Sequence, residues 1–132
     1  MNNLSQIYKK NSVESLSPGA IILLLFDTVL QSLGKAKFAM SQPFSVKNQE
    51  LLHNNLQKAE RILQELQGCL DFKPAKQLAE TLYRLYDYAQ TQINLARREK
   101  KVKNIENAEK VLKELKDGWN EMLLLRNSTP SK

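Results

Sequence analysis

The chain has 132 residues and a formal net charge of +6, from 20 lysines and arginines against 14 aspartates and glutamates. This length suits one domain with a single hydrophobic core. One cysteine and one histidine leave no internal disulfide and no set of soft metal ligands, which favours a reducing, cytoplasmic location. Glycine, proline and aromatic residues are few, a composition typical of long helices.

Residues 1–16 show no helical period, so we expect an extended or partly ordered arm over this range. Ser17 and Pro18 predict the start of the first helix, because a serine hydroxyl can cap the first turn and a proline there loses no hydrogen bond. The apolar run that follows, Ala20 to Phe26, has seven residues. It is too short to cross a bilayer and Asp27 interrupts it, so neither a membrane span nor a signal peptide is expected.

That run nevertheless carries more apolar surface than one face of a helix can bury. A surface helix of a globular protein needs only an apolar stripe on one side. The first two turns must therefore be covered on more than one side. The core of the domain, the N-terminal arm and a partner molecule are the candidate covers.

Four segments of the chain repeat apolar residues at steps of three and four, the spacing of amphipathic helices. They run from Pro18 to about residue 40, and over about residues 46–69, 74–98 and 104–126. Ser45 and Asn104 are the expected N-caps of the second and fourth helices, and Pro74 is the expected start of the third. The expected core stripes are Ile22, Leu25, Val29, Leu33, Ala36 and Met40; Leu52, Leu56, Ala59, Leu63, Leu66 and Leu70; Leu78, Leu82, Leu85, Ala89, Ile93 and Ala96; and Ile105, Ala108, Leu112, Leu115, Trp119 and Met122.

Because the joining loops are short, neighbouring helices should run antiparallel. We therefore predict an all-α fold, an antiparallel up-down-up-down four-helix bundle over residues 17–126. The N-terminal arm (residues 1–16) precedes it and a flexible tail (residues 127–132) follows it. Gly34 weakens the first helix slightly and is a candidate for close approach by a neighbouring helix.

The sequence offers no catalytic or metal-binding set. Asp27 and Asp87 are single carboxylates, and His53 has no partner at helical spacing that would form a catalytic dyad. Glu50 and His53 match the Glu-x-x-His spacing of di-metal bundles once, whereas such a site needs the motif on two helices. We therefore predict no enzyme activity, no cofactor and no metal.

The densest positive cluster leaves one alternative open. A basic cluster can bind nucleic acid, so a small basic helical nucleic-acid-binding protein is the competing interpretation. The cluster lacks interleaved aromatic residues for base stacking, and cations also suit the C-terminal end of a helix electrostatically. We favour a solvated helix end for its residues, which are Arg97, Arg98, Lys100, Lys101 and Lys103.

Short motifs are spread along nearly the whole chain: Tyr8-x-x-Asn11-Ser12-Val13, Ser17-Pro18-Gly19, Leu23-x-Leu25-Phe26-Asp27, Asn55-Leu56-Gln57-Lys58-Ala59-x-x-Ile62, Leu85-Tyr86-Asp87-Tyr88 and Trp119. Together, and in this order, they resemble the bacterial flagellin secretion chaperones, the FliS family. Each motif alone is weak, but the set spans about residues 7–122. Residues 97–101 depart from the family, which usually has asparagine after the position of Ala96.

The resemblance implies a cytoplasmic export chaperone that binds the disordered C-terminal segment of flagellin through apolar grooves and prevents premature polymerisation. Components of the flagellar export apparatus are further candidate partners. No nucleic acid, no membrane insertion and no nucleotide is implied. Such a client would dock as amphipathic helices with apolar anchors at helical spacing.

The resemblance also implies that the N-terminal arm covers an apolar pocket and moves when a client binds. We expect Ile7, Tyr8 and Val13 to form this lid, against the alternative that the arm simply completes the core. Tyr8 favours the lid, since a tyrosine can rest on an apolar surface with its hydroxyl in water. For the client groove we choose apolar residues beside the core stripes, each of which is otherwise a boundary core residue: Leu51, Ile62, Tyr83, Tyr86 and Val111.

Overall fold

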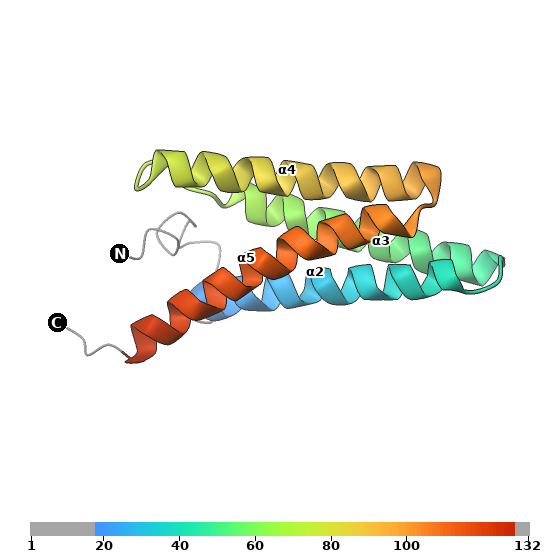
Figure 1. The fold of residues 1–132 in the computed structure, drawn as a ribbon, viewed down its shortest axis with the longest axis horizontal. Coiled ribbons are helices and arrows are strands. Elements are labelled where there is room, and N and C mark those ends of the chain that lie inside the picture. Colours follow the sequence, from blue (N-terminus) through green and yellow to red (C-terminus); the bar gives the residue numbers. More distant parts are fainter. Residues whose placement is uncertain (1–17, 129–132) are drawn as a thin grey trace.

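Four helices make up the part of the chain that the structure describes. The computed structural model describes residues 18–128, and the side chains of residues 19–122. Each helix runs antiparallel to the one before it (Figure 1), and α2 and α4 both pack against α3 and α5. The predicted all-α four-helix bundle is confirmed. The helices are α2 (Pro18–Ser41), α3 (Val46–Gly68), α4 (Lys76–Glu99) and α5 (Val102–Ser128).

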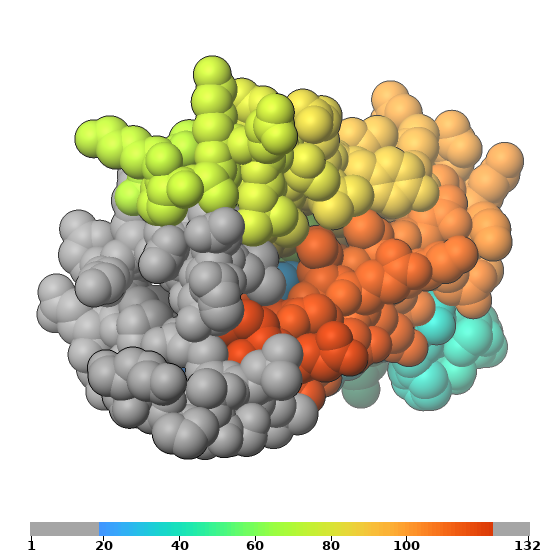
Figure 2. Space-filling model, turned by 60° about the vertical axis from the view of Figure 1, so that its left-hand side comes forward, coloured from blue at the N-terminus to red at the C-terminus, as the bar shows by residue number. Residues whose placement is uncertain are grey.

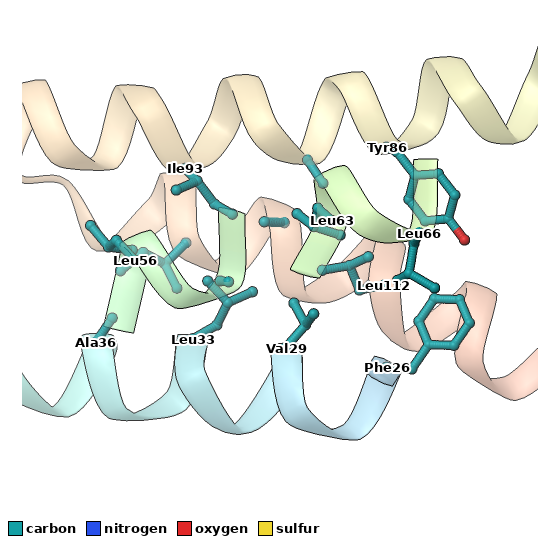
Figure 3. Packing of buried hydrophobic residues seen from close by; sticks show 14 of the residues in the cluster. Phe26, Val29, Leu33, Ala36, Leu56, Leu63, Leu66, Tyr86, Ile93 and Leu112 are labelled. Atoms are coloured by element: carbon teal, nitrogen blue, oxygen red, sulfur yellow. The ribbon is translucent and has the colours of Figure 1, made fainter. Parts of the chain in front are cut away.

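The core is a row of aliphatic side chains that all four helices supply. Figure 3 shows the side chains that point into this interior space from α2, α3, α4 and α5. Burying one such side chain contributes about 1.5–3 kcal/mol relative to leaving it exposed, so this row is the main force that holds the helices together. Its central, fully buried members are Val29, Leu33, Leu63, Ile93 and Leu112.

The predicted core stripe of α3 is confirmed in full, whereas those of α2, α4 and α5 each contain two residues that are only half-buried. In α2, Phe26 is buried and Leu25 is only half-buried. In α4, Tyr86 is buried in the place predicted for Leu85. The predicted stripes of both helices contained two successive steps of four. The observed stripe of α4 alternates steps of three and four, and that of α2 does so as far as Ala36. This is the repeat of 3.5 residues that keeps one seam facing the partner helices.

Two of the four predicted helix starts, those of α2 and α3, agree with the structure. Ser45 caps α3, since its Oγ accepts a hydrogen bond from the backbone N–H of Asn48 at 3.0 Å. α2 begins at Pro18 as predicted, whereas its expected cap, Ser17, lies outside the described residues. α4 begins at Lys76, two residues after the predicted start.

The turn between α4 and α5 is tighter than predicted. Lys100 has a left-handed φ of 56°, and its N–H bonds to the carbonyl of Ala96 at 2.9 Å. α4 therefore ends abruptly, and α5 begins at Val102. The prediction that Asn104 caps α5 is wrong. The side-chain amide of Asn104 instead donates to Oε1 of Gln92 in α4 at 2.9 Å and joins the two helices.

Two smaller expectations also change. Nothing lies within 4 Å of the position that a Cβ would take at Gly34, so the prediction of close approach there is wrong. α5 continues to Ser128, past the expected limit of the bundle at residue 126. Residues 129–132 lie outside the described range.

α2 has a second possible interpretation by composition. Its stretch Gly19–Ser41 is long and apolar enough to cross a membrane by length and composition alone. The core helix of a bundle passes the same test. α2 buries Ile22, Phe26 and Val29 and packs against α3 and α5, so we interpret it as the core helix of this bundle.

Two ion pairs fasten α2 to α5 outside the core. Nζ of Lys37 lies 2.8 Å from Oε1 of Glu109, and Nζ of Lys116 lies 2.5 Å from Oδ1 of Asp27. The hydrogen bond to Glu109 raises the pKa of Lys37 above its usual value of 10.5, and this outweighs the opposing effect of slight burial. Both pairs are partly exposed, so each contributes modestly to stability.

Replacing Ser45 by alanine should lower the free energy of unfolding by about 1 kcal/mol, the usual cost of losing a serine N-cap. The backbone N–H of Asn48 loses its acceptor. Urea denaturation measures the change. Ser41→Ala is the matched control at the other end of the same loop. The Oγ of Ser41 donates to the carbonyl of Phe38 and accepts from Nε2 of Gln42, and both hydrogen bonds are exposed, so its loss should stay within about 0.5 kcal/mol. Equal losses in the two variants would contradict a capping role for Ser45.

Replacing Lys37 by methionine should cost about 1 kcal/mol or less, as for other partly exposed ion pairs. Because the pKa of Lys37 is raised on folding, this difference from the wild type should be constant below pH 10.5 and should disappear as the pH rises through the folded-state pKa. Urea denaturation at a series of pH values measures it. The control Lys35→Met should leave stability nearly unchanged, since Lys35 makes no ion pair with any residue in the range 19–122. A difference that grows at high pH would refute the assignment.

Candidate functional site

An apolar hollow lies between α4 and α5 near the start of α2. Figure 2 shows it between the yellow-green side chains of α4 and the orange-red ones of α5, with a small area of blue α2 at its bottom. Its volume is about 180 Å³. We call it the apolar hollow. Its lining residues are Phe26, Leu78, Leu82, Tyr86, Glu114, Leu115, Gly118 and Trp119.

Buried aromatic side chains form the floor of the apolar hollow. Phe26, Tyr86 and Trp119 belong to the core cluster and are almost fully buried. Figure 3 shows the rings of Phe26 and Tyr86 at the same end of the core. Nε1 of Trp119 donates a hydrogen bond to the carbonyl of Gly19 at 3.0 Å, which ties α5 to the first turn of α2. The floor is therefore rigid and preformed.

The rim of the apolar hollow consists of side chains that the core does not fully use. Leu78 of α4 and Leu115 of α5 are only half-buried. Gly118 lies on the exposed side of α5, and nothing lies within 4 Å of the position of its missing Cβ. The absence of a side chain at Gly118 therefore leaves room between the two helices.

A second, more polar hollow continues along the same pair of helices. It has a volume of about 220 Å³ and is lined by Tyr88, Asn107, Lys110, Val111 and Glu114. Glu114 lines both hollows, so they adjoin along α4 and α5, and we treat them together as one groove. We call this the α4–α5 groove. It is apolar at one end and carries one cation and one carboxylate at the other.

A third hollow lies beside the loop between α3 and α4. Phe72, Glu80, Tyr83 and Arg84 line a volume of about 350 Å³. The rings of Phe72 and Tyr83 lie 6.1 Å apart at an interplanar angle of 53°, a tilted arrangement that favours aromatic pairing. This hollow is open and belongs to a different face of α4 from the α4–α5 groove.

The structure brings together two of the five residues predicted for the client groove. Tyr86 and Val111 both line the α4–α5 groove, although Tyr86 is fully buried and contributes to its floor. Tyr83 lies in the hollow with Phe72. Leu51 is exposed and Ile62 half-buried on α3, and neither lines any of the three hollows described above. The predicted lid residues Ile7, Tyr8 and Val13 lie outside the described residues.

Sequence reasoning missed most of the apolar hollow. Leu78, Leu82 and Leu115 had been assigned to the core stripes. Leu82 is buried as predicted and still lines the hollow, whereas the incomplete burial of Leu78 and Leu115 places these two residues on its rim. Gly118 carried a signal that could have been used. A glycine next to a predicted core tryptophan inside a helix indicates a gap or a close approach.

The groove offers binding surface and no reactive set. Among residues 19–122, no three His, Cys, Asp or Glu side chains are grouped so that they could hold a metal ion. His53 and Glu50 are both exposed on α3. The chemistry available in the groove is apolar burial with a charged margin, which suits an amphipathic helix.

The predicted basic cluster is partly engaged in contacts within the bundle. Arg97 of α4 contacts Oε1 of Glu60 in α3 at 3.1 Å and donates to Oδ1 of Asn94 at 2.7 Å. Lys101 lies 3.8 Å from Oε1 of Glu99. The role of Arg97 is therefore structural as well as electrostatic, because it links α3 to α4.

Comparison with known proteins gives one consistent family. A family model described as the flagellar protein FliS matches residues 1–125. A flagellar secretion chaperone FliS of Vibrio cholerae is 29% identical over 126 residues, which cover 92% of this chain and 90% of the relative. A flagellar secretion chaperone FliS of Escherichia coli is 30% identical over 121 residues, covering 91% of this chain and 86% of the relative. The chain therefore belongs to the FliS family of flagellar proteins.

Proposed function

We propose that this protein is a cytoplasmic flagellar secretion chaperone that binds the C-terminal segment of flagellin and prevents its premature polymerisation. Membership of the FliS family and the names of the two relatives support the chaperone role. The observation that carries the binding part is the apolar hollow between α4 and α5. A chaperone of this kind needs an apolar surface for its client and no catalytic group.

We propose the α4–α5 groove as the place where an amphipathic client helix docks. An unpolymerised flagellin end would expose apolar, helix-forming surface, and a groove accepts such a helix through anchors at helical spacing. The apolar hollow, at about 180 Å³, is smaller than the roughly 300–1,000 Å³ of small-molecule sites. It suits the anchoring side chains of a peptide better than a whole ligand. Lys110 and Glu114, farther along the groove, would contact the polar side of the client.

The affinity of this interaction is limited by the conformational entropy that a disordered client loses when it becomes ordered. A segment that folds on binding loses conformational entropy at that moment, so its affinity per unit of contact area is low. Release during export then needs no chemical step. Because apolar burial dominates in the apolar hollow, binding there should depend only weakly on salt.

The nucleic-acid alternative has less support. It rests on the basic cluster alone, and Arg97 and Lys101 of that cluster already contact carboxylates of the bundle. The cluster also lacks interleaved aromatic residues for base stacking. Family membership and the apolar hollow both favour a protein client.

Replacing Gly118 by leucine should weaken client binding while it stabilises the fold. The new side chain would project into the apolar hollow, and we expect affinity for a peptide of the flagellin C-terminal segment to fall about tenfold or more, equivalent to about 1.4 kcal/mol. Replacing an exposed helical glycine should raise the free energy of unfolding by about 0.5–1 kcal/mol. Isothermal titration calorimetry and urea denaturation measure the two effects.

Gly34→Leu is the matched control for Gly118→Leu. A Cβ at Gly34 also meets nothing within 4 Å, and Gly34 lies on α2 outside the three hollows described above. It should show the same gain in stability with unchanged binding. No binding of the flagellin peptide to the wild type at micromolar concentration would refute the proposed client. Equal binding by both variants would refute the groove as its site.

We retain the proposal that the N-terminal arm acts as a lid, although its residues lie outside the described part of the chain. Replacing Tyr8 by alanine should change the affinity for the flagellin peptide, because a side chain that competes with the client for an apolar surface is removed. The helix content measured by circular dichroism should stay nearly constant. If Tyr8→Ala instead unfolds the bundle, the arm completes the core and the lid proposal is wrong.

A further inference from the structure

The end of the bundle farthest from the start of α2 brings two basic and apolar loops together. The loop between α2 and α3 and the turn between α4 and α5 both lie at this end in Figure 1. Nζ of Lys100 in the turn donates to Oε1 of Gln49 in the first turn of α3 at 2.9 Å. We call this surface the basic tip, and its exposed residues are Phe44, Val46, Lys47, Arg98, Lys100, Lys101, Val102 and Lys103.

The basic tip holds large apolar side chains outward in an ordered loop. Phe44 is 85% exposed and Val46 is 74% exposed. The loop that carries them is fixed on both sides, because Nδ2 of Asn48 donates to the carbonyl of Pro43 at 2.7 Å and Ser45 caps α3. Phe44 is thus presented to the outside by the structure of the loop.

The basic tip is also where the positive charge of the chain gathers. Residues 42–50 and 97–106 contain six lysines and arginines against three glutamates, a net charge of +3, which is half of the +6 of the whole chain. Within the range 19–122, Lys47, Arg98 and Lys103 make no ion pair. These cations are therefore available to an external anion.

We propose that the basic tip binds the surface of an anionic lipid bilayer. Exposed aromatic and aliphatic side chains can enter the headgroup region, while the lysines and arginines around them attract anionic headgroups. The long stems of the cations can also lie against the apolar layer with their charges in water. This is peripheral binding by two loops and requires no spanning helix.

The shape of the basic tip favours a bilayer over an acidic macromolecule. None of its residues lines any of the three described hollows, so none of these hollows would hold a peptide at the tip. A polyanion such as nucleic acid would pair with the cations and leave Phe44 and Val46 in water. A bilayer satisfies both the charges and the apolar side chains at once.

Binding in this orientation would keep the apolar hollow accessible. The apolar hollow uses the first half of α4, with Leu78 and Leu82, and the second half of α5, with Leu115. The basic tip uses the opposite ends of these two helices. A client in the apolar hollow would therefore face away from the bilayer.

Co-sedimentation of the full-length protein with lipid vesicles tests this proposal. We expect binding to vesicles rich in phosphatidylglycerol, no binding to pure phosphatidylcholine vesicles, and weaker binding as salt screens the charges. Lys103→Ala should reduce the partition coefficient about fivefold, as expected for one cation near an anionic surface. Phe44→Ser should reduce it by at least about fivefold, because burial of a phenylalanine is lost.

Matched controls separate the basic tip from a general effect of charge or hydrophobicity. Lys113→Ala removes an exposed cation of α5, and Leu24→Ser removes an exposed apolar side chain of α2. Neither lies at the tip, so both should bind vesicles like the wild type, and circular dichroism checks that every variant is folded. Calorimetry with the flagellin peptide should give wild-type affinity for Phe44→Ser and Lys103→Ala, which keeps this test independent of the groove.

Three results would overturn the proposal. The first is absence of binding to the anionic vesicles. The second is an equal loss of vesicle binding in the tip variants and their controls. The third is binding of a duplex oligonucleotide or of polyglutamate, in place of vesicles, that depends on Lys103 and not on Phe44.

Discussion

The seam of buried side chains that repeats every 3.5 residues is the constraint on which the rest of this structure depends. It decides how each helix is rotated about its axis. With Tyr86 and Trp119 turned into the seam, their neighbours Leu78 and Leu115 are left half-buried at its margin. The apolar hollow is therefore a direct consequence of core packing at the end of the bundle where Gly118 supplies no side chain. A change to the seam at this end would alter the hollow as well, because the two share their floor.

The bundle could be predicted from the sequence, whereas helix rotation could not be predicted to within one residue. The periodic spacing of apolar residues and the Ser45 cap predicted the helix starts to within two residues, because these signals depend only on residues near one another in the chain. Choosing Phe26 over Leu25 required knowing which side of the helix faces the partner helices, and this depends on all four helices at once. The left-handed Lys100 carried no signal, because lysine adopts this conformation uncommonly. The lining of the α4–α5 groove was predicted least well. It joins residues of α4 to residues of α5 about thirty positions later in the chain, so it depends on how both helices are rotated about their axes.

The apolar run at the start of α2 lies at the same end of the bundle as the apolar hollow. Ile22 and Phe26 enter the core, and Leu23 and Leu25 pack partly against it. Leu24 remains 55% exposed. Most of the apolar surface of this run is thus covered within the bundle. One of its buried residues, Phe26, also forms part of the floor of the apolar hollow. The apolar surface that we propose for a partner lies on the neighbouring face, between α4 and α5, rather than on α2 itself.

The two ends of the bundle can act independently for an electrostatic reason. Leu82, in the apolar hollow, and Glu99, at the basic tip, are separated by about 26 Å along α4, at 1.5 Å per residue. This exceeds the Debye length of about 8 Å at physiological ionic strength, so exposed charge at the tip has little influence on the hollow. Substitutions that change the tip can then leave client binding intact, and the reverse also holds. A rigid bundle of long helices achieves this separation because its length keeps an apolar surface and a charged surface apart in one small domain.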